Sequence, residues 1–264
     1  MDYVVIGGDA RFEHLSRLLA ERGKTVATLG REARPWATPA DAAALGRAEN
    51  IVVNCPPKPA GLDWTLEEIL ALAREDARVF TCGPRHPEAD DGRLVDLWDD
   101  EALLLENARL TAEGAVASAM RASAGSLRDA RCLVVGWGRI GRSLTELLVA
   151  LGARVTVASR SASGRNRAVE RGAEAVATAN LGDALPGHGI VFNTAPGMVL
   201  DADTLRRADG DVLLIELASP PYGIDLHGAW SLGLRAWREP GLPGRYCPRS
   251  AAAALLAAMA RHGL

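Results

Sequence analysis

The stretch that decides the fold is Arg131-Cys-Leu-Val-Val-Gly-Trp-Gly-Arg-Ile-Gly-Arg142. An apolar run enters Gly136-x-Gly138-x-x-Gly141, a helical apolar pattern follows, and a second apolar run covers 155–158. A strand, a glycine turn and a helix in this order are typical of a dinucleotide-binding fingerprint. The first glycine permits the tight turn, the second lets backbone N–H groups reach a pyrophosphate, and the third allows close packing of helix and strand. The cofactor contacts predicted in this turn are Gly136, Trp137, Gly138, Arg139, Ile140 and Gly141.

The end of the second apolar run indicates which dinucleotide binds. A cofactor with a free ribose 2′-hydroxyl is normally held by Asp or Glu about 20 residues after the first glycine. This chain has Ser159 and Arg160 at that place. A serine and an arginine donate hydrogen bonds to a 2′-phosphate, which a carboxylate would repel, so we predict NADP rather than NAD. The alternative is that Arg160 stacks on adenine or lies in solvent.

Bulk composition narrows the class of protein. The 264 residues are 48% hydrophobic with a net charge of −3, which indicates a globular chain of about two domains. That charge gives no reason to expect binding to nucleic acid or to an anionic membrane. The N-terminus shows no secretion signal, and neither the four cysteines nor the five histidines have metal-ligand spacing. We expect a cytoplasmic protein without a metal.

A faint internal repeat predicts the fold. Residues 4–31 align without gaps with residues 133–160, and each segment reads as strand, glycine turn, helix, strand and arginine. A later strand is also echoed, since residues 51–57 resemble residues 190–196. Alternating strands and helices imply parallel sheets covered on both faces. The predicted fold class is therefore α/β, with two Rossmann-like doubly wound parallel-sheet domains and a cleft between them.

We expect residues 1–100 to form an N-terminal substrate domain and residues 101–125 a helical connector. Residues 126–264 then form the NADP-binding domain, including a C-terminal Ala/Leu helix from about Arg249 to Arg261. Within the connector, Thr111 is expected to cap the start of a new helix, and Glu113 to lie near its positive end.

The first half of the repeat has lost the features that bind a dinucleotide. Asp9 stands where the second half has Gly138, and Phe12 stands in place of Gly141. A carboxylate at the phosphate position repels the cofactor, so the first domain is expected to bind substrate. The predicted substrate-binding residues are Gly8, Asp9 and Arg11, which precede or begin a helix whose N-terminus attracts small anions. The alternative is that Asp9 only caps the helix and Arg11 lies on the surface.

Turns rich in glycine and proline follow later strands of the second half, where doubly wound sheets bind ligands. From these turns we predict further cofactor contacts by Asn193, Thr194, Pro196 and Ser219. Two-domain 2-hydroxyacid dehydrogenases carry an Arg-Gly pair and a Pro-His pair where this chain has Ser219-Pro220 and 240–243. The absence of both pairs argues against reduction of a 2-keto acid.

Five segments, at 5–11, 111–115, 135–141, 217–220 and 240–244, together resemble the A subunit of bacterial dipicolinate synthase, in the right order and over nearly the whole chain. The chain departs from the family at 221–223, where Gly-Gly is usual, and in a shorter stretch before Asp90.

The resemblance implies NADP-dependent oxidation of dihydrodipicolinate to dipicolinate in the cytoplasm of a sporulating cell. It also implies a flavoprotein-like partner, the B subunit, together with a small dicarboxylate substrate and a homo-oligomer. Under this interpretation Arg11 holds a ring carboxylate, Thr111 donates a hydrogen bond and Glu113 accepts the ring proton. The alternatives are an NADP-linked oxidoreductase of another amino, imino or 2-hydroxy acid, and a non-catalytic NADP-binding regulatory subunit.

Overall fold

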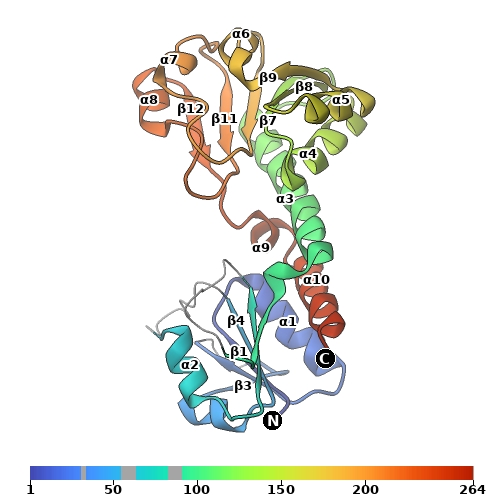
Figure 1. Ribbon diagram of the computed structural model, residues 1–264, viewed down its shortest axis with the longest axis vertical. Helices are drawn as coiled ribbons and strands as arrows, with labels where there is room; N and C mark the ends of the chain where they lie inside the picture. Colours follow the sequence, from blue (N-terminus) through green and yellow to red (C-terminus); the bar gives the residue numbers. More distant parts are fainter. Residues whose placement is uncertain (31–33, 55–63, 83–90, 264) are drawn as a thin grey trace. The chain divides into compact units, whose positions relative to one another are not determined.

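The described strands form two parallel sheets, one in each of two compact units. In this computed structural model the described residues are 1–30, 34–54, 64–82 and 91–263. The first unit combines Met1–Asn107 with Pro243–Leu264, and the second is Ala108–Leu242. Figure 1 shows both units and labels many of their helices and strands.

The first sheet has the strand order β3-β2-β1-β4-β5-β6, with every neighbouring pair parallel. Its strands are β1 (Tyr3–Ile6), β2 (Val26–Leu29), β3 (Thr38–Pro39), β4 (Asn50–Asn54), β5 (Arg78–Cys82) and β6 (Leu94–Asp96). Strand β1 is buried on both faces: Tyr3 and Val5 join one hydrophobic cluster, and Val4 and Ile6 join another. An uninterrupted apolar strand of this kind is what a parallel sheet covered on both faces requires.

The second sheet has the order β12-β11-β10-β7-β8-β9. Its strands are β7 (Arg131–Val135), β8 (Arg154–Ser159), β9 (Glu174–Ala177), β10 (Ile190–Asn193), β11 (Leu213–Glu216) and β12 (Arg235–Arg238). Numbered within its own unit, each sheet follows the order 3-2-1-4-5-6, which is the Rossmann order. The predicted pair of Rossmann-like units is therefore confirmed. Arg31 and residues 55–57, which belong to the predicted repeat, lie outside the described residues.

Helices or 3-10 turns lie between most of the consecutive strands in both units. They are α1 (Ala10–Glu21), α2 (Leu66–Leu72), α3 (Glu101–Ser123), α4 (Arg139–Ala150), α5 (Ala162–Glu170), α6 (Leu181–Ala184), α7 (Ala202–Leu205), α8 (Leu226–Ser231), α9 (Leu242–Tyr246) and α10 (Pro248–Arg261), with short 3-10 turns η1 (Ala42–Arg47), η2 (Leu97–Asp99) and η3 (Thr178–Asn180).

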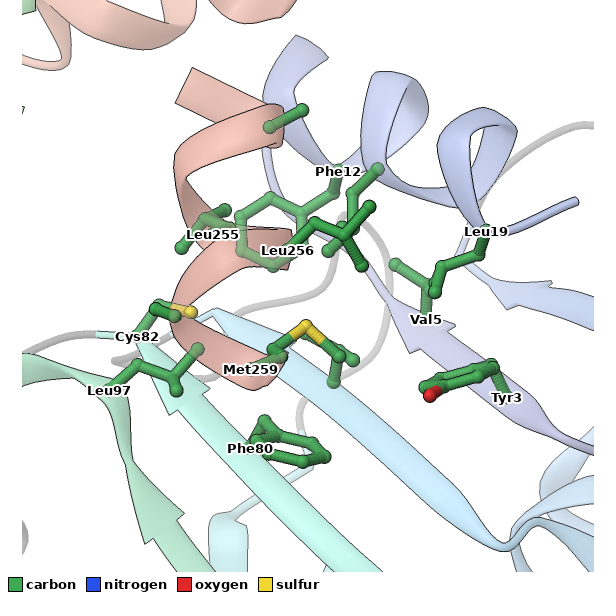
Figure 2. Packing of buried hydrophobic residues seen from close by; sticks show 14 of the residues in the cluster. Tyr3, Val5, Phe12, Leu19, Phe80, Cys82, Leu97, Leu255, Leu256 and Met259 are labelled. Carbon is green, nitrogen blue, oxygen red and sulfur yellow. The ribbon is translucent and has the colours of Figure 1, made fainter. Parts of the chain in front are cut away.

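The C-terminal helix α10 belongs to the first unit, which corrects the expectation that residues 126–264 form one domain. Leu255, Leu256 and Met259 of α10 are buried in the same cluster as Phe12 of α1 and Phe80 of β5. Figure 2 shows these side chains pointing toward one another between the two helices and the sheet. An Ala/Leu helix must bury its apolar face, and here the first sheet supplies the surface.

Helix α3 is continuous, so the predicted helix start at Thr111 is wrong. Thr111 lies in the middle of α3 and is buried, with 7% of its surface exposed. A Ser or Thr near an acidic residue is a frequent N-cap signal, but the surrounding Ala and Leu residues favour an unbroken helix. The boundary between the units falls within this helix, at 107–108.

The start of α3 is fixed to the chain end by an ion pair, from which a stability prediction follows. Arg261 donates from Nε and Nη2 to the two Asp100 carboxylate oxygens at 2.8 and 2.9 Å, and the Leu103 N–H donates to Oδ1 at 2.8 Å. These hydrogen bonds lower the pKa of Asp100 from 3.8 to about 2, and those from Arg261 have the largest effect. A carboxylate with a depressed folded-state pKa stabilises the fold above its unfolded pKa and loses this contribution as the pH falls from about 4 toward 2.

We therefore expect Asp100→Asn to lower the free energy of unfolding at pH 7 by about 1–2 kcal/mol, since Arg261 is half-exposed and solvent weakens the pair. Urea unfolding at pH 7 and at pH 2 measures this difference, which should shrink at the lower pH. Asp211→Asn, at an exposed carboxylate, serves as the matched control. A difference that stays constant with pH would contradict the assignment.

Candidate cofactor site

Gly136, Gly138 and Gly141, from the end of β7 to the first turn of α4, have different steric surroundings. Gly136 has φ +107, and a Cβ there would come within 2.5 Å of Thr194 Oγ1. A Cβ on Gly141 would lie 2.2 Å from the Gly136 carbonyl oxygen, so helix and strand are in the close contact that the fingerprint predicts. At Gly138 no atom lies within 4 Å of a Cβ position. The space for an approaching phosphate is therefore at the second glycine.

The first turn of α4 is suited to an anion because its N-cap offers no side chain. Gly138 is the N-cap and makes no side-chain cap hydrogen bond, and Arg139 and Ile140 are the first residues of the helix. The first N–H groups of a helix lack partners within the helix, and its dipole favours negative charge at that end. A pyrophosphate oxygen can satisfy both demands.

A cavity of about 350 Å³ opens at this turn, by the carboxyl ends of the strands. The predicted contacts Gly136, Trp137, Gly138, Ser159, Arg160, Thr194 and Pro196 line it, together with Ser161, Thr178, Ala195 and Val199, which were not predicted. The predicted contacts Arg139, Ile140, Gly141, Asn193 and Ser219 are outside this lining. The capping pattern Ser-x-x-Gly at the start of α5 is a signal that could have found Ser161.

The part of the cavity wall at the end of β8 carries hydrogen-bond donors. Arg165 donates from Nη1 to the carbonyl oxygens of Ser159 and Arg160, at 2.9 and 3.0 Å, and so fixes the turn. The Arg160 guanidinium is exposed and makes no hydrogen bond or ion pair with the described residues. Asp and Glu are absent from the described lining of the cavity. The positive charge of Arg160 is therefore available to an anionic ligand.

The opposite wall is fixed by a buried carboxylate. Glu216, at the end of β11, is 1% exposed and accepts a hydrogen bond from Asn193 Nδ2 at 2.7 Å. Asn193 also donates to the carbonyl of Ala195 at 2.9 Å, and Thr194 Oγ1 donates to the carbonyl of Val135 at 2.9 Å. Asn193 thus supports the lining residues that follow it, rather than facing the cavity.

Comparison with known proteins agrees with this geometry. Residues 103–218 match the NAD binding domain of D-isomer specific 2-hydroxyacid dehydrogenases. The chain is 31% identical to the A subunit of dipicolinate synthase from Bacillus subtilis over 159 residues, which are 60% of this chain and 54% of that relative. The resemblance to the A subunit of dipicolinate synthase is confirmed. The matched segment spans about half the length of this curated relative.

Two solved structures share the fold over nearly the whole chain. The A subunit of dipicolinate synthase from Bacillus halodurans has a TM-score of 0.84 at 24% identity, covering 99% of this chain and 97% of that one. Its counterpart from Bacillus subtilis has a TM-score of 0.82 at 23% identity, covering 99% and 95%. Residues 103–218, which make up most of the second unit, thus resemble a nicotinamide-dinucleotide-binding domain. Of the helices in the described ranges, none has the length and apolar character to cross a membrane.

The first unit has an equivalent turn between β1 and α1. Side chains of the first unit itself occupy this turn. Asp9 caps α1 by accepting from the Arg11 N–H at 2.9 Å, and the Arg11 guanidinium pairs with the same carboxylate at 2.8 Å. A Cβ on Gly8 would lie 2.2 Å from the ring of Phe12, and one on Gly244 would lie 2.1 Å from Asp9 Oδ2. The cap role of Asp9 is thus present, whereas substrate binding by Gly8, Asp9 and Arg11 stays a prediction.

The two predicted catalytic residues lie on α3, within the second unit. Thr111 is buried, and Glu113 is partly exposed and pairs with Arg109 one turn earlier. An i,i+4 pair of this kind is usual on a helix surface and gives the carboxylate a structural partner. Their roles in catalysis stay predictions.

Two further buried titratable groups of the second unit, Cys132 and His188, are not among the residues that line the cavity. Burial raises the pKa of the Cys132 thiol to about 12, so this cysteine is a poor nucleophile. Burial also lowers the pKa of His188, whose Nε2 lies 3.1 Å from Thr156 Oγ1. Among the residues of the described ranges, His, Cys, Asp and Glu side chains nowhere form a group of three suited to a metal ion.

Proposed function

We propose that this chain is the NADP-dependent dehydrogenase component of a dipicolinate synthase, which oxidises dihydrodipicolinate to dipicolinate. The observation that carries the cofactor choice is the unpaired Arg160 on a cavity whose described lining has no carboxylate. An NAD-binding site would place Asp or Glu at this strand end. The relatives named as dipicolinate synthase A subunits support the choice of substrate.

The residues fit a bound dinucleotide in three places. The open space at Gly138 and the N-terminus of α4, whose cap carries no side chain, suit the pyrophosphate, and Arg160 suits the 2′-phosphate. A bound nicotinamide supplies the acceptor for the hydride that leaves the dihydropyridine ring. The ring also releases one proton, for which Glu113 is the proposed acceptor, and its two carboxylates require cations, of which Arg11 is the proposed one.

Because aromatisation of the ring drives the reaction forward, positioning is the main demand on the protein. The proposal includes a flavoprotein-like partner, the B subunit, together with a homo-oligomeric state and a cytoplasmic location. The test is a spectroscopic assay with purified chain, NADP and freshly generated dihydrodipicolinate, with and without the B subunit. Reduced cofactor and the near-ultraviolet band of dipicolinate should rise together. Turnover of alanine or a 2-hydroxy acid in place of dihydrodipicolinate would contradict the proposed substrate.

A second candidate, a non-catalytic NADP-binding regulatory subunit, is favoured by two local ion pairs. Arg11 is paired with Asp9, and Glu113 with Arg109, so both proposed substrate-handling groups already have protein partners. If Glu113 and Thr111 take part in catalysis, Glu113→Gln and Thr111→Ala should each lower turnover of the reconstituted pair at least about tenfold. Unchanged turnover with both variants, while NADP still binds, would favour the regulatory role.

A further inference from the structure

The first variable position of the glycine turn carries an unsatisfied donor. Trp137 lines the cavity, and its indole Nε1 is buried without a hydrogen-bond partner. Within the described ranges two other buried side-chain atoms share this condition, Thr28 Oγ1 and His188 Nδ1, and neither residue lines this cavity. A buried donor without a partner is uncommon in folded proteins and indicates a missing ligand or a strained site.

The surroundings of this donor indicate what the missing partner is. A Cβ on Gly164 would lie 2.6 Å from Ser159 Oγ, 2.8 Å from Ser161 Oγ and 3.2 Å from Trp137 Cδ1. Since Cδ1 is bonded to Nε1, the N–H edge of the indole and the two hydroxyls gather around one glycine. Any side chain at that position would fill the space between them.

The two hydroxyls add donors to this cluster. Ser161 Oγ accepts from the Gly164 N–H at 3.0 Å, so its own proton stays available, and Ser159 Oγ makes no hydrogen bond with the described residues. The unpaired guanidinium of Arg160 borders the same cavity. A group of donors next to a free cation suits an acceptor-only dianion such as a phosphate monoester.

We propose that Trp137 is a specificity-determining residue whose indole N–H donates to the phosphate on the adenosine ribose. This inference rests on the proposed NADP-binding function and extends it to a residue outside the usual strand-end pair. The proposal requires the indole to turn so that its N–H, which is buried in the unliganded chain, faces the cavity, where the phosphate supplies its partner. A ribose with a free 2′-hydroxyl lacks the terminal phosphate oxygens that extend beyond O2′, so the indole N–H discriminates between the two dinucleotides.

The test compares Trp137→Phe with wild type in titrations with NADP, NAD and adenosine 2′,5′-bisphosphate. Phenylalanine retains an aromatic ring and removes the N–H. The dissociation constants of NADP and the bisphosphate should rise about tenfold, and that of NAD should change less than about twofold. Trp230→Phe is the matched control, because the Trp230 N–H donates to the Ala236 carbonyl at 2.8 Å and lies outside the cavity.

A second measurement covers the case in which Trp137→Phe folds poorly. The indole ¹⁵N–¹H resonance of Trp137 in the wild-type chain should shift on addition of NADP or the bisphosphate and stay in place with NAD. Wild-type binding without preference for NADP would overturn the cofactor proposal, and this inference with it. Wild-type preference for NADP, with that resonance unmoved or the preference intact in Trp137→Phe, would overturn the role of Trp137 alone.

Discussion

Replacing Arg160 by aspartate is expected to weaken NADP binding about a hundredfold and to leave NAD binding unchanged or slightly tighter. The substitution removes a charge-assisted hydrogen bond of roughly 1.5–3 kcal/mol and places a carboxylate beside the 2′-phosphate. The same carboxylate can accept hydrogen bonds from a ribose with a free 2′-hydroxyl. Calorimetry at fixed ionic strength measures the dissociation constants of NADP and NAD, and their ratio is the cofactor preference.

Arg167→Asp is the matched control for this change. Arg167 lies on α5, a few residues beyond Arg160, and is exposed outside the cavity lining. The control makes the same change of charge at nearly the same place, so it reports the general effect of net charge on a polyanionic ligand. A cofactor ratio that stays unchanged in Arg160→Asp, or changes equally in Arg167→Asp, would show that Arg160 does not select the phosphate.

The sequence predicted the parts of the cofactor site that depend on local constraints. Burial restricts β7 to apolar residues, and close backbone contact restricts positions 136 and 141 to glycine. Both restrictions can be recognised from the local sequence. Ser161 and Thr178 were missed because they come from the starts of other elements. Thr178 follows β9, a short strand with a weak pattern, so neither the strand nor its end could be recognised in advance.

The assignment of α10 depended on information that local sequence does not carry. Its apolar face predicts that the helix is buried, and its bounds, Pro248–Arg261, are close to the predicted ones. The pattern does not say which sheet buries it, and chain order favoured the second unit. Complementary partners decide instead: Phe12 and Leu19 of α1 leave a surface that Leu256 and Met259 cover. Packing between helices far apart in the sequence, such as α1 and α10, can be recognised only from the structure.

The second large effect is expected at Glu216, whose carboxylate accepts four hydrogen bonds. Oε1 accepts from Asn193 Nδ2 at 2.7 Å and from the Ala218 N–H at 2.9 Å. Oε2 accepts from the N–H groups of Gly223 and Ile224 at 2.8 and 2.7 Å. The carboxylate thus joins the turns after β10 and β11, and the first of these turns lines the cofactor cavity.

Glu216→Gln should lower the free energy of unfolding by about 2–6 kcal/mol. A glutamine side chain has one acceptor oxygen, so in either orientation its NH₂ group faces donors that then lack partners. Each buried unsatisfied donor costs roughly 1–3 kcal/mol, and at least two are created. Urea unfolding measures the loss, with the exposed Glu170→Gln as the matched control.

A loss of affinity should accompany the loss of stability at Glu216. The residues at 194–196 keep their position only while the turns are joined, so NADP binding by the folded fraction should weaken as well. Titration at a temperature where Glu216→Gln is still folded separates the two effects. A stability change below about 0.5 kcal/mol would contradict the structural role, because that is the usual range of a surface substitution. Retained stability with lost affinity would instead indicate that the carboxylate acts on the ligand.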